Sequence, residues 1–156
     1  MTSKRVVSLL KKHRPTHIDD LDGVLSTHLL QGGCFRDAYY ITGTRLVIKF
    51  PMGRYGKVHS RHEIRVIKAL THKSKFRHLS RYCPQLFYRD SKAGVLVMEL
   101  LGSVGQVSTQ VCEVVEKMFQ DTLGSREGMD LKGYNIGRNM RGQIKILDFG
   151  LVQGRL

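Results

Sequence analysis

The sequence predicts an α+β fold with a largely antiparallel β-sheet. Hydrophobic residues make up 41% of the 156 residues and charged residues 25%, a balance that allows a globular core and excludes general disorder. Apolar runs with strand spacing alternate along the chain with segments of helical spacing. The expected order is three strands, a helix, two strands, a second helix and a hairpin, within the length of one domain.

Apolar runs define the expected elements, and glycine, proline and asparagine residues separate them. Strands are expected near residues 29–30, 38–41, 46–50, 86–88 and 95–100, with a terminal hairpin at 134–137 and 143–147. Helices are expected at residues 60–70 and from Val107 to a stop at Gly124. Residues 1–23 are expected to form a basic lead-in, and residues 51–56 a loop.

The chain is strongly basic, with 26 lysine and arginine residues against 13 acidic ones and a formal net charge of +13. Residues 1–17 carry five basic residues and no acidic one, and residues 54–92 carry 11 basic residues and two acidic ones. Such a charge attracts acidic partners, although a basic surface also keeps a small domain soluble. We expect an acidic protein substrate or partner to contact cations of the second segment, namely Arg61, Arg65, Lys68, Lys73, Lys75 and Arg77.

The cysteine content and the hydropathy pattern favour a reducing, cytosol-like compartment. The three cysteines are odd in number and widely spaced, so the sequence indicates neither a disulfide framework nor a zinc site. No apolar run approaches the ~18 residues that a membrane-spanning helix needs. The apolar residues 6–10 are too few for a secretory signal. We therefore expect a cytoplasmic protein without a membrane span.

The most informative pattern lies near the carboxyl end of the sequence. Asp130-Leu131-Lys132-Gly133-Tyr134-Asn135 is followed by Asp148-Phe149-Gly150, which begins 18 positions after Asp130. A loop aspartate, an asparagine five residues later and an aspartate beside a hairpin can converge on one metal site. Such oxygen ligands suit Mg²⁺, with a nucleotide completing the coordination. The pattern predicts phosphoryl transfer from ATP.

These segments resemble the catalytic loop D-L-K-x-x-N and the metal-binding D-F-G segment of the protein kinase superfamily. Other segments between residues 30 and 150 match further kinase motifs and occur in the same order as in that family. Residues 46–49 are similar to its lysine-bearing strand, Glu63 stands on a helix 14 residues after Lys49, and residues 95–101 resemble its hinge strand. The resemblance implies a five-stranded antiparallel amino-terminal lobe with one helix at 24–100. It also implies a reduced carboxyl-terminal lobe at 101–156, made of a helix, the catalytic loop and a β-hairpin.

The resemblance implies a role for each matching residue in the carboxyl-terminal part. Asp130 would orient or accept the substrate proton, and Lys132 would screen the γ-phosphate. Asn135 and Asp148 would bind the metal. A lysine at position 132 is of the type found in Ser/Thr kinases, so a hydroxyl of a serine or threonine is the expected acceptor.

The ATP-binding residues implied by the resemblance are in the amino-terminal part and at the hinge: Gly33, Lys49, Glu63, Met98, Glu99 and Leu101. Lys49 would hold the α- and β-phosphates, and Glu63 would fix Lys49. Glu99 and Leu101 would offer backbone groups to adenine, with Met98 as the gatekeeper. A second interpretation of Glu63 stays open, because residues 60–63 also fit the S-x-x-E capping box of a helix start.

The sequence departs from the kinase pattern in three places. Only the middle glycine of the phosphate-covering loop is present, because Gln31 and Arg36 stand where the other two are expected. Residues 128–129 are Gly-Met rather than His-Arg, and only six residues follow Gly150, so we expect no activation segment and no peptide-binding helical subdomain. Such reduced kinases resemble RIO-type kinases, small-molecule and lipopolysaccharide kinases, and minimal kinases that bacteria or phages deliver into host cells.

Three functions are compatible with these patterns. The first is an ATP- and Mg²⁺-dependent phosphotransferase, a minimal Ser/Thr protein kinase acting on an acidic or partner-presented protein, in the cytoplasm or in a host cytosol. The alternative is a pseudokinase-like ATP-binding module that binds an acidic partner, such as a ubiquitin-conjugating complex or a host regulator, through its basic surface. A nucleic-acid-binding domain is supported by charge alone, because no aromatic base-stacking motif accompanies the charge.

Overall fold

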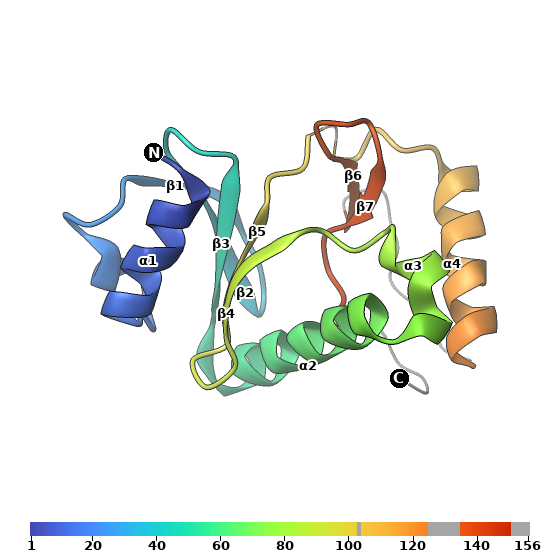
Figure 1. The fold of residues 1–156 in the computed structure, drawn as a ribbon, viewed down its shortest axis with the longest axis horizontal. Helices are drawn as coiled ribbons and strands as arrows, with labels where there is room; N and C mark the ends of the chain where they lie inside the picture. Colours follow the sequence, from blue (N-terminus) through green and yellow to red (C-terminus); the bar gives the residue numbers. More distant parts are fainter. Residues whose placement is uncertain (103, 125–134, 151–156) are drawn as a thin grey trace. The chain divides into compact units, whose positions relative to one another are not determined.

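The computed structural model describes residues 1–102, 104–124 and 135–150, which form an α+β fold (Figure 1). The chain divides into two compact units. Unit 1 comprises Met1–Ile64 and Gln85–Leu100, and unit 2 comprises Arg65–Pro84 and the described residues from Leu101 onward. The boundary between the units falls inside helix α2 (Gly53–His72).

Unit 1 contains the expected five-stranded antiparallel sheet. Its strand order is β1-β2-β3-β5-β4, and α2 follows β3 in the chain. The strands are β1 (Thr27–Gly32), β2 (Arg36–Ile41), β3 (Leu46–Pro51), β4 (Leu86–Asp90) and β5 (Val95–Glu99). In the central pairs, Lys49 lies opposite Ala38 of β2 and opposite Leu96 of β5. The prediction of an α+β chain with this sheet is confirmed.

Alternating residues of β3 pack on opposite faces of the sheet. Ile48 and Phe50 belong to the core cluster that contains Val6 and Leu10 of helix α1 (Ser3–His13). Val47 belongs to a separate cluster that contains Ile64 of α2. Because side chains alternate along a strand, Lys49 lies on the same face as Val47, the face that α2 covers.

The first 23 residues, expected as a basic lead-in, are part of the core of unit 1. They form α1 and a short 3₁₀ helix, η1 (Ile18–Leu21). Val6 and Leu10 have no exposed surface, and Leu21 is also buried. One apolar stripe in a basic segment is only a weak indication of a helix in the sequence, because a helix of this length owes its stability to packing rather than to helix propensity.

Helix α2 begins seven residues before the expected start at Ser60. Residues 53–56 were expected in a loop because glycine destabilises a helix, but Gly56 is helical and an added Cβ there would overlap the carbonyl oxygen of Phe35. The close approach of the β1–β2 turn therefore requires glycine at this position. Ser60 is fully buried in the middle of α2, so the capping-box interpretation of Glu63 is wrong.

Unit 2 contains the second expected helix and the expected hairpin. Helix α4 (Thr109–Leu123) ends at Gly124, which caps it with a positive φ of 65°. The hairpin consists of β6 (Ile136–Arg138) and β7 (Ile144–Ile146). Two short helices, η2 (Ser74–Phe76) and α3 (Arg77–Ser80), lie between the expected helix at 60–70 and the expected strand at 86–88, where no element was predicted. Residues 65–84, assigned from the sequence to the amino-terminal lobe, cluster with unit 2. Over the described ranges, none of the helices has the length and apolarity to cross a bilayer.

Candidate functional site

Lys49 and Glu63 form a buried ion pair in unit 1. The Lys49 amine lies 3.3 Å from Oε1 of Glu63, and the two residues are 7% and 0% exposed. The strand alternation of β3 directs Lys49 toward α2, and Glu63 lies on the buried stripe of that helix with Ile67. The sequence expectation that Glu63 partners Lys49 is therefore realised as a direct contact.

Arg36 is a second cation on the same carboxylate. Its guanidinium pairs with Oε2 of Glu63, and its side chain is as buried as that of Lys49. Arg36 and Ala38 lie two residues apart on β2 and therefore share a face of the sheet, and Ala38 packs in the cluster beneath α2. In the sequence, Arg36 stands where a glycine of the phosphate-covering loop is expected, and its contact with Glu63 was not predicted. Ala38 lies opposite Lys49, and Arg36 is two residues from Ala38 on the same strand. This spacing places Arg36 on the face that carries Lys49, and it is the signal that would have identified the contact.

The β1–β2 turn, expected to cover phosphates, is tied to the first half of α2. The turn contains Gly33, whose backbone N–H donates to the carbonyl of Arg36. The ring of Phe35 stacks on His59 with a centroid distance of 4.4 Å, and the Phe35 carbonyl accepts from the backbone N–H of Met52. With the Arg36–Glu63 pair, these contacts hold the turn against α2 through backbone, ring and charge interactions.

The residues expected beside adenine lie at the end of β5 and directly after it. Met98 is fully buried in the α2-facing cluster and pairs with Val47, two residues from Lys49. The backbone N–H of Glu99 donates to the carbonyl of Gln85, the residue before β4, so this N–H already has a partner within unit 1. Leu101 is 5% exposed and begins the second segment of unit 2.

Asn135 and Asp148 flank the open end of the β6–β7 hairpin in unit 2. Ile136 pairs with Ile146, and the backbone N–H of Leu147 donates to the carbonyl of Asn135 over 2.8 Å. This register brings Asn135 and Asp148 to the same end of the hairpin, as the sequence predicted. Oδ1 of Asp148 accepts a hydrogen bond from the backbone N–H of Gly150 over 2.6 Å. This contact constrains the turn that follows β7.

Phe149 anchors this segment in the core of unit 2. It has no exposed surface, and its ring lies 6.1 Å from that of Phe119 on α4, which in turn contacts the ring of Tyr82 edge-on. β7 is further held by Lys145, whose amine donates to the carbonyls of Arg81 and Cys83. Aromatic packing and hydrogen bonds thus define the position of Asp148 within the unit.

The remaining predicted site residues, Asp130 and Lys132, lie outside the described residues. Among the described ones, Gly33, Lys49, Glu63, Met98 and Glu99 belong to unit 1. Leu101, Asn135 and Asp148 belong to unit 2. Within the described part of the chain, no group of three or more histidine, cysteine and acidic side chains is arranged to hold a metal ion.

The six cations expected to contact an acidic partner are all exposed. Arg61 is engaged in unit 1, where its guanidinium donates to the carbonyls of Ser91 and Lys92. In unit 2, the Lys75 amine lies 4.5 Å from the centroid of the Phe76 ring. Arg61 therefore has a structural contact that the sequence did not predict.

A scan against models of known protein families finds no match to this chain, and a search of curated proteins finds no similar sequence.

Proposed function

We propose that this chain is an ATP- and Mg²⁺-dependent phosphotransferase, a minimal Ser/Thr protein kinase that acts on an acidic or partner-presented protein in the cytoplasm. Lys49 contacts the α- and β-phosphates of ATP and Glu63 orients Lys49. Asn135 and Asp148 hold Mg²⁺. Asp130 accepts the proton of the substrate hydroxyl, while the oxygen of that hydroxyl bonds to the γ-phosphorus and ADP leaves.

The observation that carries this proposal is the buried pair of Lys49 and Glu63. Transferring charged groups into a protein interior costs several kcal/mol per ion, and apolar residues of similar size would often stabilise a fold as well or better. A lysine held on a central strand by a helix-borne glutamate is therefore better explained by a ligand than by stability. A phosphate group is the ligand whose charge and geometry match an oriented ammonium.

The chemistry of the donors in both units fits ATP and Mg²⁺. Mg²⁺ prefers oxygen ligands and keeps part of its coordination for substrate phosphates and water, which the carboxylate of Asp148 and the amide of Asn135 allow. The strand order of unit 1, with α2 between β3 and β4 in the chain, agrees with the kinase resemblance of residues 46–63. These agreements support the proposal from separate parts of the chain.

Nucleotide binding is tested by the thermal stability of the full chain with ATP, in the presence and absence of Mg²⁺. We expect ATP with Mg²⁺ to raise the melting temperature, and Asp148→Ala to abolish the part that depends on Mg²⁺. Asp121→Ala, at an exposed position on α4, is the matched control and should respond like the parent. A parent protein that ATP does not stabilise at about millimolar concentration would contradict the proposal, because a specific ligand at that excess must shift the unfolding equilibrium.

Phosphoryl transfer is tested separately with γ-labelled ATP. Asp130→Ala should lower transfer to the protein itself or to an acidic protein substrate by orders of magnitude, since the carboxylate acts on the reacting hydroxyl. Binding of ATP should persist in this variant. Equal transfer by Asp130→Ala and the parent would show that the assigned role of Asp130 is wrong.

A second candidate function is a pseudokinase-like module that binds ATP as a structural ligand and an acidic protein through exposed cations such as Arg65 and Lys68. The ion pair between Arg36 and Glu63 favours it, because this contact draws on the carboxylate that orients Lys49. Stabilisation by ATP without any transfer from γ-labelled ATP would select this function over the first. A nucleic-acid-binding function rests on the net charge alone, and a steep salt dependence of oligonucleotide binding would be its signature.

A further inference from the structure

A groove runs between α1 and β4 in unit 1, and its lining contains none of the predicted site residues. Its larger part has a volume of about 640 Å³ and is lined by Lys11, Arg14 and all five residues of β4. A second hollow of about 400 Å³ is lined mainly by the first half of α1 and by Phe87. Lys11 and Phe87 line both, so the two hollows adjoin along the helix.

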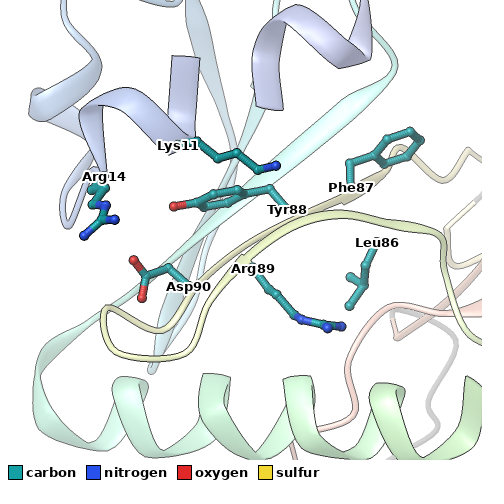
Figure 2. Close-up of a pocket in the computed structure, with 7 residues that line it drawn as sticks. All are labelled: Lys11, Arg14, Leu86, Phe87, Tyr88, Arg89 and Asp90. Atoms are coloured by element: carbon teal, nitrogen blue, oxygen red, sulfur yellow. The ribbon is translucent and has the colours of Figure 1, made fainter. Parts of the chain in front are cut away.

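The wall of the groove formed by α1 is cationic. Lys4, Lys11 and Arg14 line it and are exposed, and residues 1–17 contain no acidic residue. Figure 2 shows Lys11 extending over Tyr88, with Arg14 on the same side of β4, whereas Arg89 points to the other side of the strand. The positive charge on this side of the groove is therefore supplied by α1 and by Arg14 at its carboxyl-terminal end.

The floor of the groove is apolar and lies at an edge of the sheet. Phe87 and Tyr88 are half-buried and pack against the cluster that contains Val6 and Leu10. Within the described residues, β4 pairs only with β5, so its outer edge offers backbone groups to an extended chain. Val7 and Phe87 provide an apolar end in the smaller hollow.

These features favour a peptide over a nucleic acid as the ligand. Asp90 also lines the groove, and its carboxylate is fixed by hydrogen bonds from the backbone N–H groups of Lys92 and Ala93. A nucleic acid carries negative charge at every nucleotide and would be repelled at Asp90. A peptide can combine acidic side chains near α1 with a neutral residue near Asp90.

We propose that the groove between α1 and β4 binds an extended acidic segment of another protein. Carboxylates of the segment contact Lys4 and Lys11, and one large apolar side chain enters the hollow beside Phe87. The lining contains none of the residues assigned to ATP, so the proposal does not depend on the proposed catalytic function.

The test uses a fluorescein-labelled, glutamate-rich peptide with one central leucine, and measures its binding to the full chain by anisotropy. The groove variant is Lys4→Glu/Lys11→Glu. The matched control is Arg5→Glu/Lys12→Glu, which makes the same change in net charge with the same spacing on α1 at exposed positions that do not line the groove. A third variant, Ser8→Phe, fills the smaller hollow without changing the charge.

We expect the groove variant to weaken binding by about ten-fold or more, and the control by less than about three-fold, because only the groove cations contact the peptide. Ser8→Phe, and replacement of the leucine in the peptide by alanine, should each weaken binding several-fold. Equal losses in both charge variants would overturn the proposal, as would the absence of binding at about millimolar peptide. Tighter binding of a single-stranded oligonucleotide, with the same loss in the groove variant, would assign the groove to nucleic acid instead.

Discussion

The guanidinium of Arg36 and the amine of Lys49 pair with the two oxygens of one buried carboxylate, that of Glu63. The three side chains come from β2, β3 and α2, so they connect the sheet to the helix through charge. Two cations share one anion at this position, and Glu63 is therefore the residue on which the cluster depends.

The first prediction concerns the unequal importance of these three residues for stability. Glu63→Gln removes the carboxylate that both cations contact and should lower the free energy of unfolding by about 3–5 kcal/mol. Arg36→Met leaves the Lys49–Glu63 pair in place and should cost much less. Urea unfolding of the two variants measures the difference, and equal losses would show that the carboxylate is not the centre of the cluster.

The second prediction concerns the contact between the β1–β2 turn and α2. Gly56→Ala places a Cβ on the carbonyl oxygen of Phe35, so the turn or the start of α2 must shift, at a cost of about 1–3 kcal/mol. Gly32→Ala is the control, because a Cβ there would meet only the Asp37 carboxylate at 3.4 Å, an ordinary contact distance. Thermal unfolding of both variants tests this, and a Gly56→Ala protein as stable as the control would contradict the close approach.

The third prediction uses the three free cysteines. Burial raises the pKa of the Cys83 thiol to about 12 and also raises the pKa of Cys112, so at pH 8 both remain protonated as well as shielded. Cys34 is exposed in the β1–β2 turn. Iodoacetamide should therefore modify Cys34 alone in the native protein, as measured by mass spectrometry of the intact chain.

The same reaction also reports on nucleotide binding. If the β1–β2 turn covers phosphates, ATP with Mg²⁺ should slow the modification of Cys34, and Cys34→Ser should remove the native-state labelling altogether. Labelling of Cys83 at a comparable rate in the folded chain would be inconsistent with its burial. An unchanged rate at Cys34 with saturating ATP would exclude a role for the turn in covering the nucleotide.

The fourth prediction concerns the anchor of the segment that carries Asp148. Phe149→Ala removes a fully buried ring that packs on Phe119 and should destabilise the protein by about 3–5 kcal/mol. Met140→Ala, at a position 71% exposed in the β6–β7 turn, should change stability by less than about 0.5 kcal/mol. Denaturant unfolding measures both, and a small effect of Phe149→Ala would show that the ring is not part of the core.

Local patterns in the sequence predicted most of the secondary structure. The strands and helix α4 follow from runs and spacings of apolar residues that lie close together in the chain. The start of α2 was predicted too late because Gly53 and Gly56 precede Ser60 and glycine disfavours a helix, which is a local property. The need for glycine at position 56 comes from the Phe35 carbonyl, which is distant in the sequence. Helix α1 was missed because its stability comes from the sheet against which Val6 and Leu10 pack.

The amino-acid sequence by itself predicted the order of the five strands, of helices α2 and α4 and of the terminal hairpin, and thereby the position of Asn135 and Asp148 at one end of that hairpin. Each of these depends on a period or a turn spanning a few residues, which sterics and hydrogen bonding set locally. Only the tertiary structure decided that Arg36 also binds Glu63, 27 residues away, and that α1 and β4 enclose a basic groove. Both depend on strand register and on the packing of helices against the sheet, where the burial of many distant side chains decides jointly which charged groups meet.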